Sequence, residues 1–284
     1  MSRQNSPLPD LETPARAAAS HPWMEKLARW GYAAKGVVYF IIGLLATQAA
    51  FTTGGKTTDS QGALVEILNQ PFGKILLAAI AIGLSGYVLW CLVQAIFDPE
   101  HSRKKKEAIA PLRRIGYALS ALGYAGLALT AVKLLIGRGS TGGDATKDWT
   151  ARFMSQPFGQ WLVGLAGLAV IGVAISYFYQ AYKASFQKHL QLHRLSRTQQ
   201  KWVKSLGRFG IAARGVVFGI IGTFLCLAAL NSNPDEARGI GGSLAVLANQ
   251  PSGPWILGIV ATGLIAYSLY CLLEARYRSI AKPN

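Results

Sequence analysis

Six polar or charged residues lie inside or at the edge of long apolar runs, where an ionisable side chain is costly and usually functional. They form two sets of three, and the members of each set occupy equivalent places in a repeated motif. The first set is Lys35, Ser120 and Arg214, and the second is Gln94, Gln180 and Glu274. Because a guanidinium near hydrocarbon gains from a carboxylate partner, Arg214 and Glu274 are predicted to form an ion pair.

Two roles remain open for these sets. The residue types track each other, since Lys35 goes with Gln94 and Arg214 goes with Glu274. Long basic side chains can extend along apolar surface to the lipid headgroups, which would make Lys35 and Arg214 interfacial residues. Alternatively, the sets form a ring of polar groups around a pseudo-threefold axis, and Lys35, Ser120 and Arg214 line a cytoplasmic vestibule.

One motif, written three times, positions these residues. It reads G-Y-A-A-K-G-V-V-Y-F-I-I-G from Gly31, G-Y-A-L-S-A-L-G-Y-A from Gly116 and G-I-A-A-R-G-V-V-F-G-I-I-G from Gly210. A Gln-Pro pair follows the start of each copy 39 or 40 residues later and precedes a second apolar run. A repeat at a fixed period indicates one structural unit used several times, which here is a pair of long apolar segments.

The apolar runs are long enough to cross a membrane as helices. They cover residues 36–51, 75–97, 115–136, 161–182, 215–230 and 255–273. With its flanks, each run approaches the ~20 residues that a helix needs to span ~30 Å of hydrocarbon. The runs do not alternate apolar and polar residues as the strands of a membrane barrel do. The predicted fold is therefore all-α, with six transmembrane helices arranged as three tandem helical hairpins around a pseudo-threefold axis.

The chain divides into three membrane repeats, two basic cytoplasmic linkers and two cytoplasmic tails. The repeats are predicted at residues 23–99, 111–183 and 202–278, the linkers at 100–110 and 184–201, and the tails at 1–22 and 279–284. The first tail is polar and Pro-rich and is expected to be disordered. Gly43 and Gly222 are small residues that should let the two helices of one hairpin approach each other closely.

A short apolar-periodic segment precedes each Gln-Pro pair and is predicted to be a helix on the outer surface. It should end before the proline, because the residue ahead of proline is pushed out of the helical region. The proline can then start the next membrane helix in its first turn. Gln70, Gln156 and Gln250 are either parts of these turns or a ring around an external pore mouth.

The formal net charge of +16 would suit a nucleic-acid-binding protein, but the positions of the charges explain it better. With the N-terminus inside the cell, 22 of the 29 Lys and Arg residues fall in cytoplasmic segments and the other 7 fall in external loops. This asymmetry follows the positive-inside rule, which predicts that both termini are cytoplasmic. Nucleic acid is therefore not an expected partner.

Basic and aromatic residues near the predicted membrane surface are candidates for contact with lipid headgroups. The basic candidates are Arg103, Lys104, Lys105, Lys106, Arg113 and Arg114. Clusters of this kind attract anionic lipids. Trp23 and Trp202 each begin an amphipathic segment and suit the interface as aromatic anchors. Membrane lipids, anionic ones included, are the expected partners, and a partner protein cannot be named.

Motifs for catalysis or cofactor binding are absent from the sequence. It contains no G-x-x-x-x-G-K loop and no H-E-x-x-H, and no Asp or Glu lies at mid-depth in an apolar run, as ion-coupled pumps generally need. His189 and His193 have the spacing of a metal pair, but no third ligand is evident, so no metal site is predicted. Cys91, Cys226 and Cys271 fall in apolar runs and are interpreted as small buried hydrophobes. We therefore expect no enzyme activity, no catalytic residue and no cofactor.

The motif from Gly31 to Gly43, the downstream Q-P-F-G and the three two-helix units resemble the bacterial integral membrane proteins of domain-of-unknown-function family 1206. The resemblance covers about residues 23–278, and the second repeat departs from it at Ser120, where the others have Lys35 or Arg214. It implies a multi-pass protein of the bacterial cytoplasmic (inner) membrane and supplies no catalytic residues.

Two functions remain as hypotheses. One is a non-enzymatic membrane protein that acts through contacts with lipids or a partner protein. The other is a small channel or facilitator, with Lys35, Ser120 and Arg214 lining its vestibule. The absence of charge at mid-membrane depth favours the first hypothesis. A water-filled cavity beside the three residues would favour the second.

Overall fold

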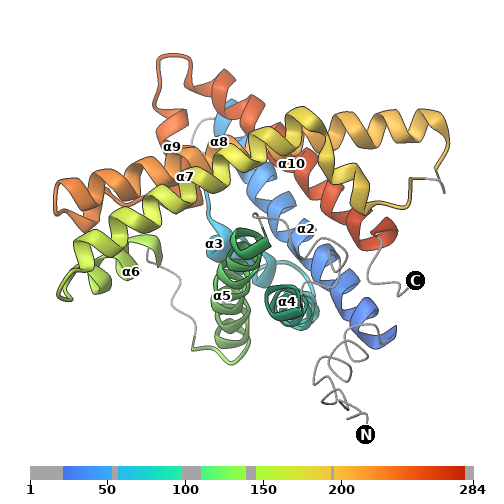
Figure 1. Cartoon of the computed structure of the whole chain (residues 1–284), viewed down its shortest axis with the longest axis horizontal. Coiled ribbons are helices and arrows are strands. Elements are labelled where there is room, and N and C mark those ends of the chain that lie inside the picture. Colours follow the sequence, from blue (N-terminus) through green and yellow to red (C-terminus); the bar gives the residue numbers. More distant parts are fainter. Residues whose placement is uncertain (1–21, 53–56, 98–109, 139–144, 193–194, 279–284) are drawn as a thin grey trace, which may run out of the picture.

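The computed structural model is all-helical in the residues that it describes, which are 22–52, 57–97, 110–138, 145–192 and 195–278 (Figure 1). Its long helices are α2 (Pro22–Phe51), α4 (Gly73–Phe97), α5 (Ala110–Leu135), α7 (Gly159–Lys183), α8 (Arg197–Leu230) and α10 (Gly253–Tyr277). All six are long and apolar enough to cross a membrane. The predicted fold class, all-α with six candidate membrane spans, is confirmed.

A short helix joins the two long helices of each repeat. These connecting helices are α3 (Ser60–Leu68), α6 (Ala145–Met154) and α9 (Ile240–Ala248), and single 3-10 turns lie at η2 (Ser185–His189) and η4 (Pro234–Glu236). The Asp59 carboxylate caps α3 by accepting a 2.8 Å hydrogen bond from the Gly62 amide. Each connecting helix ends ahead of its Gln-Pro pair, as predicted, but the next long helix begins two residues after the proline and not at it.

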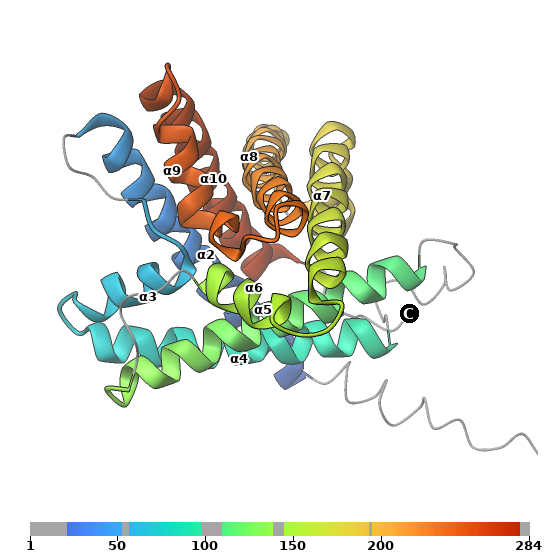
Figure 2. The same cartoon turned by 90° about the vertical axis from the view of Figure 1, so that its left-hand side faces the viewer.

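The long helices that run side by side belong to different repeats. Both views show α4 beside α5, α7 beside α8, and α2 beside α10, while α2 and α4 of the first repeat cross each other (Figures 1 and 2). Each second helix of a repeat therefore packs along the first helix of the next repeat. The third repeat packs on the first in the same way, so the six helices form an open ring in the order α5, α4, α2, α10, α8, α7.

Small residues make these contacts between repeats possible. A Cβ atom on Gly43 would lie 3.0 Å from the Ala261 carbonyl oxygen of α10, and one on Gly222 would lie 2.9 Å from the Gly167 carbonyl oxygen of α7. The prediction that Gly43 and Gly222 pack the two helices of one hairpin is therefore wrong. Both glycines lie on the helix face that meets a neighbouring repeat, and spacing along the sequence does not distinguish the two faces.

Three arginines at equivalent positions form hydrogen bonds across the interfaces between repeats, at one end of the ring. Arg29 of α2 donates to the carbonyl oxygens of Ala275, Arg276 and Arg278 over 2.8, 2.6 and 3.2 Å. Those carbonyls are the unpaired acceptors at the end of α10, where a positive charge is favourable.

The other two arginines repeat this arrangement. Arg114 donates to Ala95 and Ile96 at the end of α4, and Arg208 donates to Ala181 near the end of α7. The acceptors Ala95, Ala181 and Ala275 stand at the same distance after their Gln-Pro pairs. The arginine caps therefore follow the repeat, and they hold each repeat to the one before it.

The ring is open within the second repeat. In the first repeat α2 packs on α4, and in the third α8 packs on α10, but α5 and α7 make almost no contact. Figure 1 shows α5 nearly end-on while α7 runs across the picture, and in Figure 2 their directions are again different. A Cβ atom on Gly116 or Gly172 would meet no atom within 4 Å. The two helices of the second repeat are thus held by their neighbours and not by each other.

Candidate functional site

Lys35 lies inside the ring, on the inner face of α2. Its side chain is 4% exposed, and its Nζ donates a long 3.5 Å hydrogen bond to the Tyr87 hydroxyl. The ammonium also lies 5.1 Å from the centre of the Tyr87 ring, 5.2 Å from Tyr267, 5.8 Å from Tyr124 and 5.9 Å from Tyr32. All four distances are within the ~6 Å at which an aromatic ring attracts a cation.

Arg214 occupies the equivalent place on α8 and has a similar environment. It is 8% exposed, and its Nη1 donates to the Tyr267 hydroxyl. The guanidinium carbon lies 4.8 Å from the centre of the Tyr177 ring, 4.9 Å from Tyr267 and Phe218, and 5.3 Å from Tyr39. Tyr267 therefore contacts both cations, and the two sites form one cluster.

We call this the cation–tyrosine cluster. It consists of Lys35, Arg214, Tyr32, Tyr39, Tyr87, Tyr124, Tyr177, Tyr267 and Phe218. The rings also contact one another edge to face, with Tyr39 and Tyr267 at 4.9 Å and Tyr87 and Tyr124 at 4.8 Å between centres. Such ring pairs add stability beyond the area that they bury. The cluster thus joins all three repeats at the inside of the ring.

The repeated sequence explains why these residues meet. Tyr32 and Tyr39 lie three residues before and four residues after Lys35, so all three occupy one face of α2. Tyr87 and Tyr267 are equivalent residues on α4 and α10. These tyrosines were not predicted as site residues, although the helical spacing of Tyr32 and Tyr39 from Lys35 was a signal that could have identified them.

The second repeat contributes rings to the cluster but no cation. Ser120 stands where the other repeats have Lys35 and Arg214, and its hydroxyl donates over 2.8 Å to the carbonyl oxygen of Gly116 in its own helix. Lys35, Ser120 and Arg214 are therefore not a ring of equal polar groups. The two cations are packed against aromatic side chains, and this packing differs from the vestibule that the sequence suggested.

Glu274 does not pair with Arg214. Its carboxylate forms a buried ion pair with Arg278, the residue that directly follows α10, and the Arg278 guanidinium also lies 4.8 Å from the centre of the Tyr32 ring. The predicted Arg214–Glu274 ion pair is wrong. A partner four residues further along the chain is already in reach, whereas Arg214 points to the tyrosines inside the ring.

The remaining members of the second set lie in different environments. Gln94 of α4 is fully buried, and neither polar atom of its side-chain amide has a hydrogen-bond partner among the described residues. Gln180 of α7 is only partly buried. The second set therefore contains one buried amide, one partly exposed amide and one ion-paired carboxylate, and it does not form a continuous polar ring.

The candidate headgroup contacts divide into described and undescribed residues. Trp23 and Trp202 are exposed at the start of the first and third repeats, where an interfacial anchor would be. Arg113 is partly buried, and Arg114 is exposed while it caps α4. Residues 103–106 and His193, as well as the side chain of His189, lie outside the described part of the structure. The headgroup contacts stay predictions.

The glutamines of the Gln-Pro pairs were predicted to be either parts of turns or a ring around an external pore mouth. The side chains of Gln70, Gln156 and Gln250 are exposed. Gln70 donates to the Glu66 carboxylate over 3.2 Å, and Gln250 donates to the Val246 carbonyl oxygen over 3.3 Å. Two of the three glutamines are thus bonded to their own connecting helix, which favours the turn interpretation over a pore mouth.

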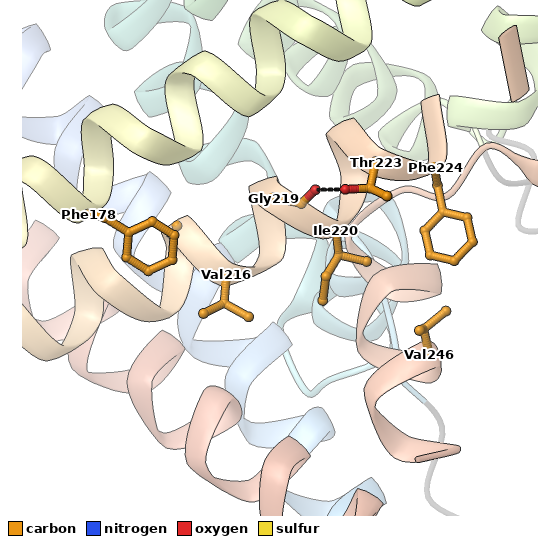
Figure 3. A pocket seen from close by; sticks show the side chains of 8 residues that line it. Phe178, Val216, Gly219, Ile220, Thr223, Phe224 and Val246 are labelled. Carbon is orange, nitrogen blue, oxygen red and sulfur yellow. Dashed lines mark hydrogen bonds between the residues drawn. The ribbon is translucent and has the colours of Figure 1, made fainter. Parts of the chain in front are cut away.

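A shallow groove of about 380 Å³ lies on α8 and not at the cluster (Figure 3). It is lined by Phe178, Gly215, Val216, Gly219, Ile220, Thr223, Phe224 and Val246. The one hydroxyl in this lining, that of Thr223, is used within α8, where it donates over 2.9 Å to the Gly219 carbonyl oxygen. The groove therefore offers hydrocarbon contacts and no polar site.

Three equivalent helix pairs, six candidate spans and a buried cluster drawn from every repeat define a multi-span helical membrane protein built from one repeated unit. The chain belongs to the family described as Domain of Unknown Function (DUF1206), which matches residues 30–98, 115–184 and 209–278. The resemblance noted in the sequence is thereby confirmed, including the count of three repeats.

A curated relative covers almost the whole chain. The chain is 39% identical to "Uncharacterized protein YxxB" of Bacillus subtilis (strain 168) over 257 residues, which are 90% of this chain and 92% of the relative. No solved structure matches.

Proposed function

We propose that this protein is non-enzymatic and acts by binding a membrane lipid, which reaches it sideways from the bilayer through the second repeat. The observation that supports this proposal is the gap between α5 and α7, since the corresponding helices of the other repeats pack together. The gap lies between two membrane-spanning helices. Its surroundings are therefore hydrocarbon and not water.

The faces beside this gap are small and apolar. Gly116 and Gly123 share one face of α5 because they are seven residues apart, and Gly172 lies on α7. A Cβ atom on any of these glycines would meet nothing within 4 Å. Such faces leave room for an acyl chain, and the cations behind Tyr124 and Tyr177 add a polar end to the same region. An amphiphile matches both features, which favours a lipid over a wholly apolar partner helix.

A channel or facilitator would need a polar path along the inside of the ring. Lys35 and Arg214 are instead packed against tyrosine rings, and the groove of Figure 3 is apolar. Both observations support binding over conduction.

The proposed location is the bacterial cytoplasmic membrane, with both termini in the cytoplasm. The distribution of Lys and Arg supports this orientation, with 22 on the predicted inner side and 7 on the outer. A cysteine placed in the loop at residues 231–238 should react with an impermeant reagent added to whole cells, and a cysteine placed at residues 102–107 should react only after lysis. The reverse pattern would overturn this orientation.

The lipid proposal can be tested by filling the gap. The full chain is purified in mild detergent, and the lipids that remain bound are measured by native mass spectrometry. We expect bound lipid on the wild type and at least a tenfold loss in the double variant Gly116→Leu, Gly172→Leu. The control is Ala79→Leu, which adds bulk to an exposed face of α4 away from the gap.

Two results would contradict the proposal. Wild-type protein that keeps no lipid in any mild detergent would show that lipid is not held specifically. Equal lipid retention by the double variant and the Ala79→Leu control, with both variants folded, would show that the gap is not the binding site.

A further inference from the structure

Lys35 and Arg214 are two cations buried in the same cluster. Within the described residues, neither has a carboxylate within ion-pair distance, because Glu274 is paired with Arg278. Both cations contact the same ring, Tyr267, so they also repel each other. Charges of one sign in a low-dielectric interior are costly unless a counter-charge is present. The surrounding rings supply only part of that compensation.

Within the described part of the chain, most of the hydrogen-bond donors of the two cations are unused. An ammonium has three donors and a guanidinium has five. Among the described residues, Lys35 makes one long bond to Tyr87, and Arg214 makes one bond to Tyr267, while the buried Nε of Arg214 has no partner there. The two tyrosine hydroxyls accept these bonds, and the Tyr267 hydroxyl is also hydrogen-bonded to Cys271. The cluster therefore presents many donors, and the guanidinium has the planar fork that suits phosphate or carboxylate.

The open second repeat leads to these donors. Tyr124 of α5 covers Lys35 at 5.8 Å, and Tyr177 of α7 covers Arg214 at 4.8 Å, measured to the ring centres. Both rings are only partly buried, and they stand on the two helices that flank the gap. These two rings are therefore the part of the cluster that borders the gap.

We propose that Lys35 and Arg214 bind one oxyanion, a phosphate or a carboxylate group, between them inside the ring. The inference rests on the proposed lipid-binding function for the source of the anion, because a lipid entering at the gap would carry the group on its head. The same chemistry would hold a free anion, so the test separates the two sources.

The experiment measures apparent dissociation constants for the purified full chain. One arm titrates inorganic phosphate and follows the thermal unfolding midpoint in neutral detergent. The other arm compares nanodiscs of phosphatidylcholine with nanodiscs that also contain phosphatidylglycerol, and counts retained lipid by native mass spectrometry. We expect phosphatidylglycerol to be bound at least tenfold more tightly than phosphatidylcholine, and free phosphate to bind more weakly.

Variants test whether the binding depends on the two cations. Lys35→Gln and Arg214→Gln should each remove at least tenfold of the preference for phosphatidylglycerol. Lys204→Gln, which removes a charge from the exposed start of α8, should keep that preference. Should a glutamine variant fail to fold, Lys35→Arg and Arg214→Lys keep the charge and change the donor geometry, and they should shift the preference in the folded protein.

The outcomes separate this inference from the proposed function. Lipid binding with no preference for the anionic headgroup, or an equal preference in the glutamine variants and Lys204→Gln, overturns the inference and leaves the proposed function standing. Phosphate binding that depends on Lys35 and Arg214, without lipid retention, supports the inference with a free anion as the source and contradicts the proposed function. Binding of neither probe overturns the inference.

Discussion

The second repeat differs from the first and third at the positions where the two helices of a repeat would meet. A Cβ atom on Gly31 would lie 2.7 Å from the Tyr87 backbone nitrogen, and one on Gly210 would press on the backbone of Tyr267. The equivalent Gly116 has nothing within 4 Å, and Val173 stands at the position of the two tyrosines. The loss of helix packing thus accompanies the loss of the tyrosine.

The cation is lost in the same repeat, where Ser120 replaces Lys35 and Arg214. Contacts with the neighbouring repeats are nevertheless kept, since Arg114 caps α4 and Gly167 packs on Gly222. The comparison indicates that the contacts between repeats hold the ring together. The two helices of one repeat can therefore lie apart, as α5 and α7 do, while the contacts between repeats are kept.

The largest expected effect comes from adding bulk at the equivalent glycines. Gly31→Leu and Gly210→Leu should each destabilise the protein by about 3 kcal/mol or more, because the new side chain lands on the backbone of the crossing helix. Gly116→Leu should cost much less, because its face is open. Unfolding in detergent, followed by circular dichroism, measures the difference. Equal losses at all three positions would show that the second repeat is closed in solution.

The next effect concerns the ion pair of α10. Removing one partner of the buried pair, by Glu274→Ala or Arg278→Ala, should cost on the order of 3 kcal/mol, since the other charge is left buried. The double variant should lose less than the sum of the two. The matched cycle with Glu274→Ala and Arg214→Ala should be close to additive. Strong coupling in that second cycle would restore the Arg214–Glu274 pair that the sequence suggested.

Much of the fold could be predicted because short segments of the sequence determine where each helix begins and ends. The apolar runs set the six spans, and the Gln-Pro pairs set the ends of the connecting helices. The pairing of the helices could not be predicted in this way. A long helix can have small residues on two faces, such as Gly31 and Gly43 of α2, and the sequence does not say which face meets which neighbour.

The candidate site was predicted in part for the same reason. Lys35 and Arg214 were identifiable as charges in apolar surroundings, and both are in the cluster. The partner of Glu274 was missed because two arginines were within reach of it, and Arg278, which is nearer in sequence and directly follows α10, makes the pair. Arg29 and Arg208 occupy equivalent places in the repeated sequence, but their role as caps depends on a contact between repeats that no local pattern encodes.

The arginine caps should show a smaller and graded effect. Arg29→Met should destabilise the protein by about 1–2 kcal/mol, because Arg29 bonds three carbonyl oxygens, and Arg208→Met should cost less because it bonds one. Methionine keeps the apolar stem and removes the donors. Equal losses would mean that the stem and not the cap provides the stability, and would weaken the view that these arginines fasten the ring.

The smallest expected effect is a change in stability that has opposite signs in the second repeat and in the first. Gly116→Ala should stabilise the protein by about 0.5–1 kcal/mol, because alanine favours the helix and its methyl group meets no atom. Gly31→Ala should destabilise it instead, because the same methyl group would press on the backbone of Tyr87. The two variants are matched in chemistry and in place within the repeat, so only the packing differs. Destabilisation by Gly116→Ala, measured by the same unfolding assay, would mean that α7 comes against α5 and that the second repeat closes like the others.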